Sequence, residues 1–255
     1  LKQYRLGVYL MINSDTGYEC TIHVGPYYEE NAFLRFEWSP ANAGDIGYES
    51  VSDFINYLAD HCHGITRHSF NITRLDFAVD ITGVRPDDLI IDIAGMRRSA
   101  GDYDVNGRTE TLEIGHKKGK RRYIIYDKTV EAATRRVVMP QVTRFEARLR
   151  DNFSTSDLQS ISNPLLPVRV EEWIHITDAV ISDRRRIMFL DSCRYRGKMA
   201  ALRFYSSNGR QQMREWLNRV ARAAWWEPEG LWREGWPPIR FKLMVLFGYR
   251  VRCRV

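Results

Sequence analysis

Two aspartates, a glutamate and a tyrosine lie in the middle of the chain in runs that suit metal-dependent chemistry on an anion. Asp76 and Asp80 belong to RLDFAVD, Tyr126 to YIIYDK and Glu146 to TRFEARLR. The first and last runs alternate apolar and polar residues, which predicts strands with their polar side chains on one face. Carboxylate oxygens suit Mg²⁺ and Mn²⁺, and a deprotonated phenol is a nucleophile. We expect Asp76 and Glu146, with Asp80 as a further ligand, to hold a divalent cation beside Tyr126.

Basic residues accompany these acids at short spacing. Lys128 lies two positions beyond Tyr126, so on a continuing strand both side chains would share a face and the ammonium would favour the phenolate. Arg74 and Arg144 each stand two residues before an acid, where they could orient the carboxylates or contact a phosphate. Tyr123, three residues before Tyr126, faces the opposite way and is expected in the core.

The elements that must position these residues form an α+β pattern. Thr111–Ile114 and Tyr123–Tyr126, joined by a turn rich in Gly, His and Lys, predict a β-hairpin. Further expected strands are 4–12, 20–25, 32–38, 70–82 and 141–150. Expected helices are 51–63, 86–100, 131–136 and 209–226. The C-terminal part contains a cluster of four tryptophans, Trp225, Trp226, Trp232 and Trp236. Such a cluster more often packs a helix onto a sheet than stacks on nucleic-acid bases, so we favour a packing role.

Bulk composition sets the broad class. A chain of 255 residues with 44% hydrophobic and 27% charged residues is one large domain or two small ones. No apolar run approaches the ~20 residues of a membrane span, so we expect no membrane partner. Four scattered cysteines (Cys20, Cys62, Cys193 and Cys253) favour free thiols and a cytoplasmic location.

Charge is divided unevenly along the chain. Residues 1–110 carry 9 Lys and Arg against 17 Asp and Glu, a net −8, whereas residues 111–255 carry 29 against 15, a net +14. Of the 38 basic residues 31 are Arg, the better bidentate ligand for phosphate. This pattern favours nucleic acid as a partner, and a merely solvated basic surface is the equal alternative.

The triplet His61-Cys62-His63 imitates a His-hydrophobic-His metal motif. That motif needs a strand, in which both His point to one face. Here Cys62 completes the apolar stripe of a helix and the two His flank its end, so a structural role is favoured. A zinc site that also includes His68 fits no standard ligand spacing.

RLDFAVD, TLEIGHKKGKRRYIIYDK and TRFEARLR, in this order and spacing, resemble the replication initiation factor family over roughly residues 70 to 165. These are the Rep_trans-type initiators of rolling-circle plasmids and phages, with related relaxases of mobile elements. The resemblance implies a curved antiparallel sheet of the nickase type with flanking helices. It implies a catalytic core of residues 1–165, followed by a basic, helical, Trp-rich part of residues 166–255.

The resemblance also implies an activity. Members nick one DNA strand at an origin, often on an extruded hairpin, through a tyrosine that stays joined to the 5′-phosphate and frees a 3′-hydroxyl. That tyrosine would be Tyr126, and Asp76 and Glu146 would hold Mg²⁺ or Mn²⁺. Partners would be origin DNA, a host helicase and a polymerase, and a homodimer is left open.

The chain departs from the family at two positions. Glu113 stands where an aromatic residue is usual, as an additional ligand or a surface acid, and His116 stands where a small polar residue is usual. Basic and neighbouring residues expected to contact DNA are Arg74, His116, Lys117, Lys118, Lys120, Arg121, Arg148, Arg184, Arg185 and Arg186.

Three other functions stay open. A nickase of the His-motif class would use His61, His63 and a tyrosine. A non-catalytic DNA-binding protein would keep Asp76 and Glu146 as structural acids. A metal-dependent nuclease with activated water would cut DNA without a covalent adduct.

Overall fold

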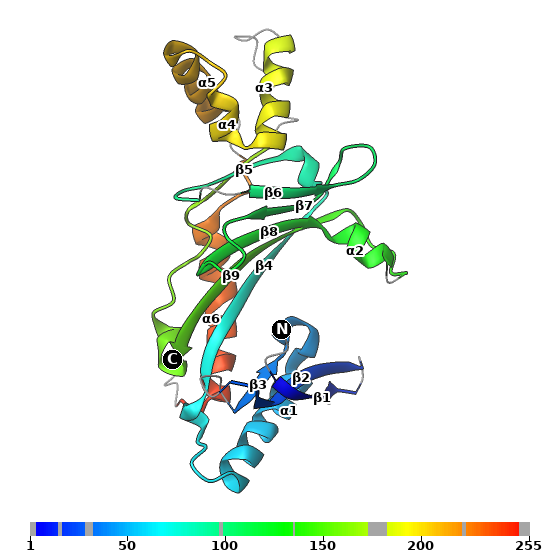
Figure 1. Cartoon of the computed structure of the whole chain (residues 1–255), viewed down its shortest axis with the longest axis vertical. Coiled ribbons are helices and arrows are strands. Elements are labelled where there is room, and N and C mark those ends of the chain that lie inside the picture. The colour runs from blue at the N-terminus through cyan, green and yellow to red at the C-terminus, as the bar shows by residue number, and fades with distance from the viewer. Residues whose placement is uncertain are drawn as a thin grey trace. The chain divides into compact units, whose positions relative to one another are not determined.

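A computed structural model of the chain describes residues 4–14, 17–28, 33–96, 99–134, 136–172, 183–220 and 223–249 (Figure 1). The chain forms two compact units. The first unit comprises Leu1–Asn71, Phe153–Ser160 and Pro237–Val255, and the second comprises Ile72–Asn152 and Ile161–Trp236. This division differs from the boundary expected at residue 165. That boundary separates a catalytic core from a basic C-terminal part, and it stays a prediction.

The first unit is built on a small antiparallel sheet in the order β1-β2-β3, with one helix. Its elements are β1 (Tyr4–Asn13), β2 (Tyr18–Pro26), β3 (Leu34–Glu37) and α1 (Pro40–His61). The predicted hairpin, third strand and helix are confirmed, although α1 begins eleven residues earlier than its apolar stripe suggested, at Pro40. Ile12, Cys20, Val51 and Ile55 are buried in this unit, so its core joins strand and helix residues.

The second unit contains a curved antiparallel sheet of five strands in the order β4-β9-β8-β7-β6 (Figure 1). Its strands are β4 (Asn71–Thr82), β6 (Ser99–Tyr103), β7 (Thr109–Ile114), β8 (Arg121–Asp127) and β9 (Val142–Ser154). The predicted central hairpin is β7–β8, and residues 143–149 of β9 pair with the whole of β8. The expected α+β class with a curved antiparallel sheet is therefore confirmed. The short helix α2 (Lys128–Thr134) follows β8 directly, three residues earlier than expected.

The helix predicted over residues 86–100 is wrong. Pro86–Asp88 form a single 3₁₀ turn, Leu89–Ile93 form β5, and β6 begins at Ser99. β5 pairs antiparallel with β10 (Val168–Glu172), which lies more than seventy residues further along the chain. Pairing with this distant strand satisfies the backbone hydrogen bonds of the apolar run LIIDI. Strand propensity depends strongly on tertiary context, so the run forms a strand here.

One face of the large sheet forms the core of the second unit. Tyr123, Ile125, Phe145 and Ala147 are almost fully buried on it and pack in one cluster with Trp226. Phe77 also contacts the rings of Trp232 and Trp236 at centroid distances of 5.1 Å in both cases. These two residues lie in the N-terminal half of α6 (Pro228–Leu246). The packing role favoured for the tryptophans is confirmed for these three, and the other face of the sheet is left for polar groups.

Three helices after β10 share a second cluster of buried residues. They are α3 (Asp183–Arg196), α4 (Lys198–Leu202) and α5 (Ser207–Val220). The cluster contains Ile90, Phe189, Leu190, Cys193, Ala201, Leu202, Met213, Trp216 and Leu217. The helix expected over 209–226 is confirmed as α5, but it ends at Val220 and residues 223–226 are not helical. Residues 221 and 222 lie outside the described residues. Among the helices that the structure describes, none is long and apolar enough to cross a bilayer.

The cysteines agree with the expectation of free thiols where they are described. Cys20, Cys62 and Cys193 are free, and Cys20 and Cys193 are buried. Cys253 lies outside the described residues.

Candidate active site

The polar face of the large sheet gathers the predicted residues through strand register. Tyr126 on β8 lies opposite Arg144 on β9, and Ile124 lies opposite Glu146. Because alternate residues of a strand share a face, Tyr126, Arg144 and Glu146 lie on the side away from the buried Tyr123 and Phe145. Asp76 on β4 reaches the same group from the neighbouring strand through Arg148.

Tyr126 donates a hydrogen bond to Glu146. Its hydroxyl oxygen lies 3.1 Å from Oε1 of Glu146, and both side chains are partly buried. Burial raises the pKa of Tyr126 above its ordinary value, the nearby Glu146 and Glu131 carboxylates raise it further, and the Arg144 guanidinium lowers it. The phenol is therefore held protonated, with a proton acceptor already in contact.

Asp76 and Glu146 meet at one guanidinium. Nε of Arg148 lies 3.1 Å from Oδ2 of Asp76, and Nη2 of Arg148 lies 3.4 Å from Oε2 of Glu146. Arg74 also donates to Asp76, with Nε 2.8 Å from Oδ1. The two expected metal ligands thus share the Arg148 guanidinium as a partner. Glu146 directs one oxygen to this guanidinium and the other to the phenol of Tyr126.

Asp80 belongs to a second group on this face. Arg144 donates to both its oxygens, at 2.6 and 2.8 Å, and Nζ of Lys128 lies 3.0 Å from Oδ2. The hydrogen bond from Arg144 is the main cause that lowers the pKa of Asp80. Lys128 is not on a continuing strand, because β8 ends at Asp127 and Lys128 opens α2. The expectation that Lys128 shares a strand face with Tyr126 is therefore wrong. Asp127 caps α2, because its Oδ1 accepts the backbone N–H of Thr129 at 2.9 Å.

Glu113 lies on β7 opposite Ile124, and it forms an ion pair with Arg122. Arg122 is only 9% exposed and lies opposite Arg148. Sequence reasoning missed Arg122, although its alternation with Ile124 and Tyr126 placed it on the polar face. The pairing makes Glu113 a counter-ion of Arg122, on the same face as Glu146.

The turn of the β7–β8 hairpin presents the expected basic residues to solvent. His116, Lys117, Lys118, Lys120 and Arg121 are exposed. His116 Nδ1 accepts the backbone N–H of Lys118 at 3.1 Å, and Lys120 pairs with Asp151 at 2.9 Å. The positions of these residues are compatible with contact to a backbone of phosphates.

The other predicted residues lie elsewhere. Arg184, Arg185 and Arg186 occupy the first turn of α3, in the helical part of the second unit. Tyr123 is 1% exposed and donates to the carbonyl of Pro164 at 2.9 Å, which confirms its place in the core.

The His61 triplet lies at the C-terminal end of a helix. His61 is the last residue of α1 in the first unit and its ring stacks on Tyr57 at 4.2 Å, while Cys62 caps the helix. Cys62 is half-buried, so it lies at the end of the apolar stripe and is not fully covered by the core.

Among the described residues, the candidate metal ligands form no group larger than a pair. Within the described part of the chain, no three His, Cys, Asp or Glu side chains are grouped closely enough to hold one ion. Asp76 and Glu146, however, share Arg148 as a common cationic partner. Mg²⁺ is commonly bound by one or two carboxylates, with waters and substrate phosphate completing its shell. Asp76 and Glu146 have the donor chemistry for that mode, although the Arg148 guanidinium occupies the position between them. The four-acid set with Asp80 and Glu113 does not form.

No protein-family model matches the chain. No curated protein matches it either. Among solved structures, a rolling-circle replication initiator protein from Geobacillus stearothermophilus is similar, with a TM-score of 0.40 and 15% sequence identity, over 73% of this chain and 74% of that chain. A likeness at this level concerns only the course of the backbone. Any inference about chemistry must rest on the residues of this chain.

Proposed function

We propose that this protein is a DNA-nicking replication initiator in which Tyr126 attacks a phosphodiester of single-stranded DNA. The observation that carries the proposal is the hydrogen bond from Tyr126 to Glu146, on a sheet face that also holds Asp76, Arg144 and Arg148. A nucleophile, a proton acceptor and basic groups for a phosphate are thereby within contact of one another.

The reaction follows from these contacts. The phenol oxygen of Tyr126 forms a bond to phosphorus, and its proton passes to Oε1 of Glu146, 3.1 Å away. The bond from phosphorus to the 3′-oxygen breaks, and that oxygen takes a proton from solvent as a free 3′-hydroxyl. The DNA 5′-phosphate remains joined to Tyr126. The phosphotyrosine retains a phosphodiester bond, so the strand can be rejoined without ATP.

The basic residues have separable roles in this scheme. Arg144 lies beside the Tyr126 hydroxyl, where its charge lowers the pKa of the phenol and favours the developing phenolate. Lys128 and Asp80 hold the Arg144 side chain in place through their shared contacts. Arg74 and Arg148 orient Asp76 in the same manner.

A divalent cation would be held by Asp76 and Glu146. Bound there, Mg²⁺ or Mn²⁺ would supply positive charge to the phosphate, which lowers the barrier to attack by an anion. Arg148 contacts both carboxylates, so it and the cation would compete for them.

The test is covalent trapping on DNA. The protein is incubated with Mn²⁺ and a labelled pool of single-stranded oligonucleotides of random sequence, and adducts that resist SDS are counted. We expect Tyr126→Phe to abolish the adduct while DNA binding is retained. Tyr123→Phe is the matched control, because it removes the other hydroxyl of the same strand from a buried position.

Each other outcome favours a different function. DNA cleavage without adduct would favour a nuclease that activates water, and binding without cleavage would favour a non-catalytic DNA-binding protein. Adduct formation that is lost in a His61→Ala, His63→Ala double variant would favour the His-motif class. Adduct loss in Tyr123→Phe in place of Tyr126→Phe would contradict the assignment of the nucleophile.

A further inference from the structure

The helices that follow β10 concentrate positive charge. Residues 183–220 carry ten Lys and Arg against three Asp and Glu, a net +7, whereas the whole chain has a net +6. Arg184, Arg185 and Arg186 occupy the first turn of α3. Arg185 lies over the ring of Tyr205, 5.5 Å from its centroid. The partial positive charge at the N-terminus of the helix adds to the attraction of this end of α3 for a phosphate.

α5 has two distinct faces. Gly209, Met213, Trp216 and Leu217 face the core of the helical cluster. The opposite, exposed stripe holds Ser207, Gln211, Arg214 and Asn218, spaced at intervals of four, three and four residues. Arg and Gln are residue types that read guanine and adenine edges by paired hydrogen bonds. The exposed stripe therefore has the composition of a helix that reads bases.

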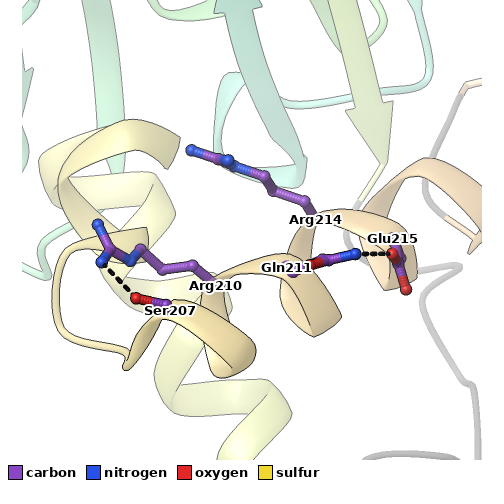
Figure 2. Close-up of a pocket in the computed structure, with 5 residues that line it drawn as sticks. All are labelled: Ser207, Arg210, Gln211, Arg214 and Glu215. Atoms are coloured by element: carbon purple, nitrogen blue, oxygen red, sulfur yellow. Dashed lines mark hydrogen bonds between the residues drawn. The ribbon is translucent and has the colours of Figure 1, made fainter.

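Figure 2 shows this surface closely. Arg210 and Arg214 extend from α5 to the same side in the view, and they line an open hollow with Ser207, Gln211 and Glu215. Arg210 lies 3.4 Å from the hydroxyl of Ser207, and Gln211 donates to Glu215 at 2.9 Å. These are local contacts on the helix surface, which a DNA contact can replace at small cost.

The helices are held firmly against the rest of the second unit. Lys198 of α4 is 7% exposed and its Nζ lies 3.2 Å from Oε1 of Glu171 on β10. Tyr195 of α3 donates to the carbonyl of Gly107 at 2.9 Å. A turn of four residues, 203–206, joins α4 to α5, and the shared core fixes α5 with its polar stripe outward.

We propose that α3, α4 and α5 form a module that binds duplex DNA, with the exposed stripe of α5 in the major groove. Gln211 and Arg214 would face base edges, while Arg184 and Arg185 contact phosphates. A short helix and turn before an exposed, basic helix is the arrangement by which helix-turn-helix proteins dock. The module would deliver duplex sequence recognition, a function separate from the single-stranded chemistry of Tyr126.

The first experiment measures duplex binding by fluorescence anisotropy, on a labelled duplex of mixed sequence and on duplexes selected from a random pool. We expect affinity for the mixed duplex to fall steeply with salt, with a logarithmic slope of about −0.9 for each phosphate contacted. Selection should enrich a defined sequence. No duplex binding, or tighter binding to single strands than to any selected duplex, would overturn the proposal.

Two variants separate the two kinds of contact. Arg214→Ala should weaken binding to the selected duplex by about 5- to 100-fold and to the mixed duplex much less, because it removes a base contact. Arg184→Ala with Arg185→Ala should weaken both alike and flatten the salt slope by about 2. Arg214→Ala that binds the selected duplex as tightly as the unaltered protein would contradict the base-reading role.

Controls keep this test apart from the nicking proposal. Arg233→Ala removes an exposed arginine of α6 outside the module and should leave duplex binding unchanged. Tyr126→Phe should also bind duplex normally, whether or not the unaltered protein forms an adduct. Thermal unfolding followed by circular dichroism confirms that each variant is folded.

Discussion

At the scale of residues, the hydrogen-bonded carboxylate of Glu146 affects the pKa of the Tyr126 phenol. Burial and Glu146 both raise the pKa of Tyr126, and Arg144 opposes them. A raised phenol pKa keeps the nucleophile neutral until a substrate or a cation brings compensating charge. Under the proposed function, positive charge that approaches Glu146 would therefore favour the phenolate of Tyr126.

Glu146→Gln should lower the pKa of Tyr126, because it removes the negative charge that opposes phenolate formation. The pKa is measured by ultraviolet difference titration, taking each protein against its own Tyr126→Phe counterpart. Below the ordinary phenol pKa of about 10 the neutral phenol contributes its full stability, which is lost as pH rises through the raised folded-state pKa. A Tyr126 pKa that is unchanged or higher in Glu146→Gln would contradict this coupling.

At the scale of elements, the alternation of polar and apolar residues in β4 and β9 could be predicted from the sequence alone. The period of two is a local property, so Asp76, Asp80 and Glu146 were placed on one face correctly. The partners of these acids could not be predicted, because they depend on the register between β4, β8 and β9. Arg148 lies between Asp76 and Glu146 because of that register. Arg122 lies beside Glu113 because of the register between β7 and β8.

The buried ion pair of Lys198 and Glu171 joins α4 to β10. The Lys198 and Glu171 side chains are 7% and 3% exposed. Burial raises the pKa of Glu171 and Lys198 lowers it. Removal of one partner leaves a buried charge, whereas removal of both leaves none.

We expect Lys198→Met to reduce the free energy of unfolding by about 3–5 kcal/mol at neutral pH. The loss should shrink in mild acid, because Glu171 can then take up a proton. The double variant Lys198→Met, Glu171→Leu should recover most of the stability. Urea denaturation of the three proteins measures these differences, and a single variant as stable as the double one would contradict the role of the pair.

At the scale of the whole molecule, the sequence predicted the class of fold but not its division into units. Each unit combines segments far apart in the chain, which composition along the sequence cannot reveal. The helix predicted over 86–100 failed for a similar reason, since β5 finds its partner in β10. The charge asymmetry was visible in the sequence, but its concentration on α3 and α5 required the structure.

The most direct measurement is mass spectrometry of the protein–DNA adduct after digestion of both components. The protein is incubated with Mn²⁺ and random single-stranded DNA, and the peptide that carries a nucleotide is sequenced. We predict a nucleotide joined through a 5′-phosphate to Tyr126, with none on Tyr123 and none formed when the cation is removed by a chelator. A nucleotide on another residue, or strand breaks without any modified peptide, would contradict it.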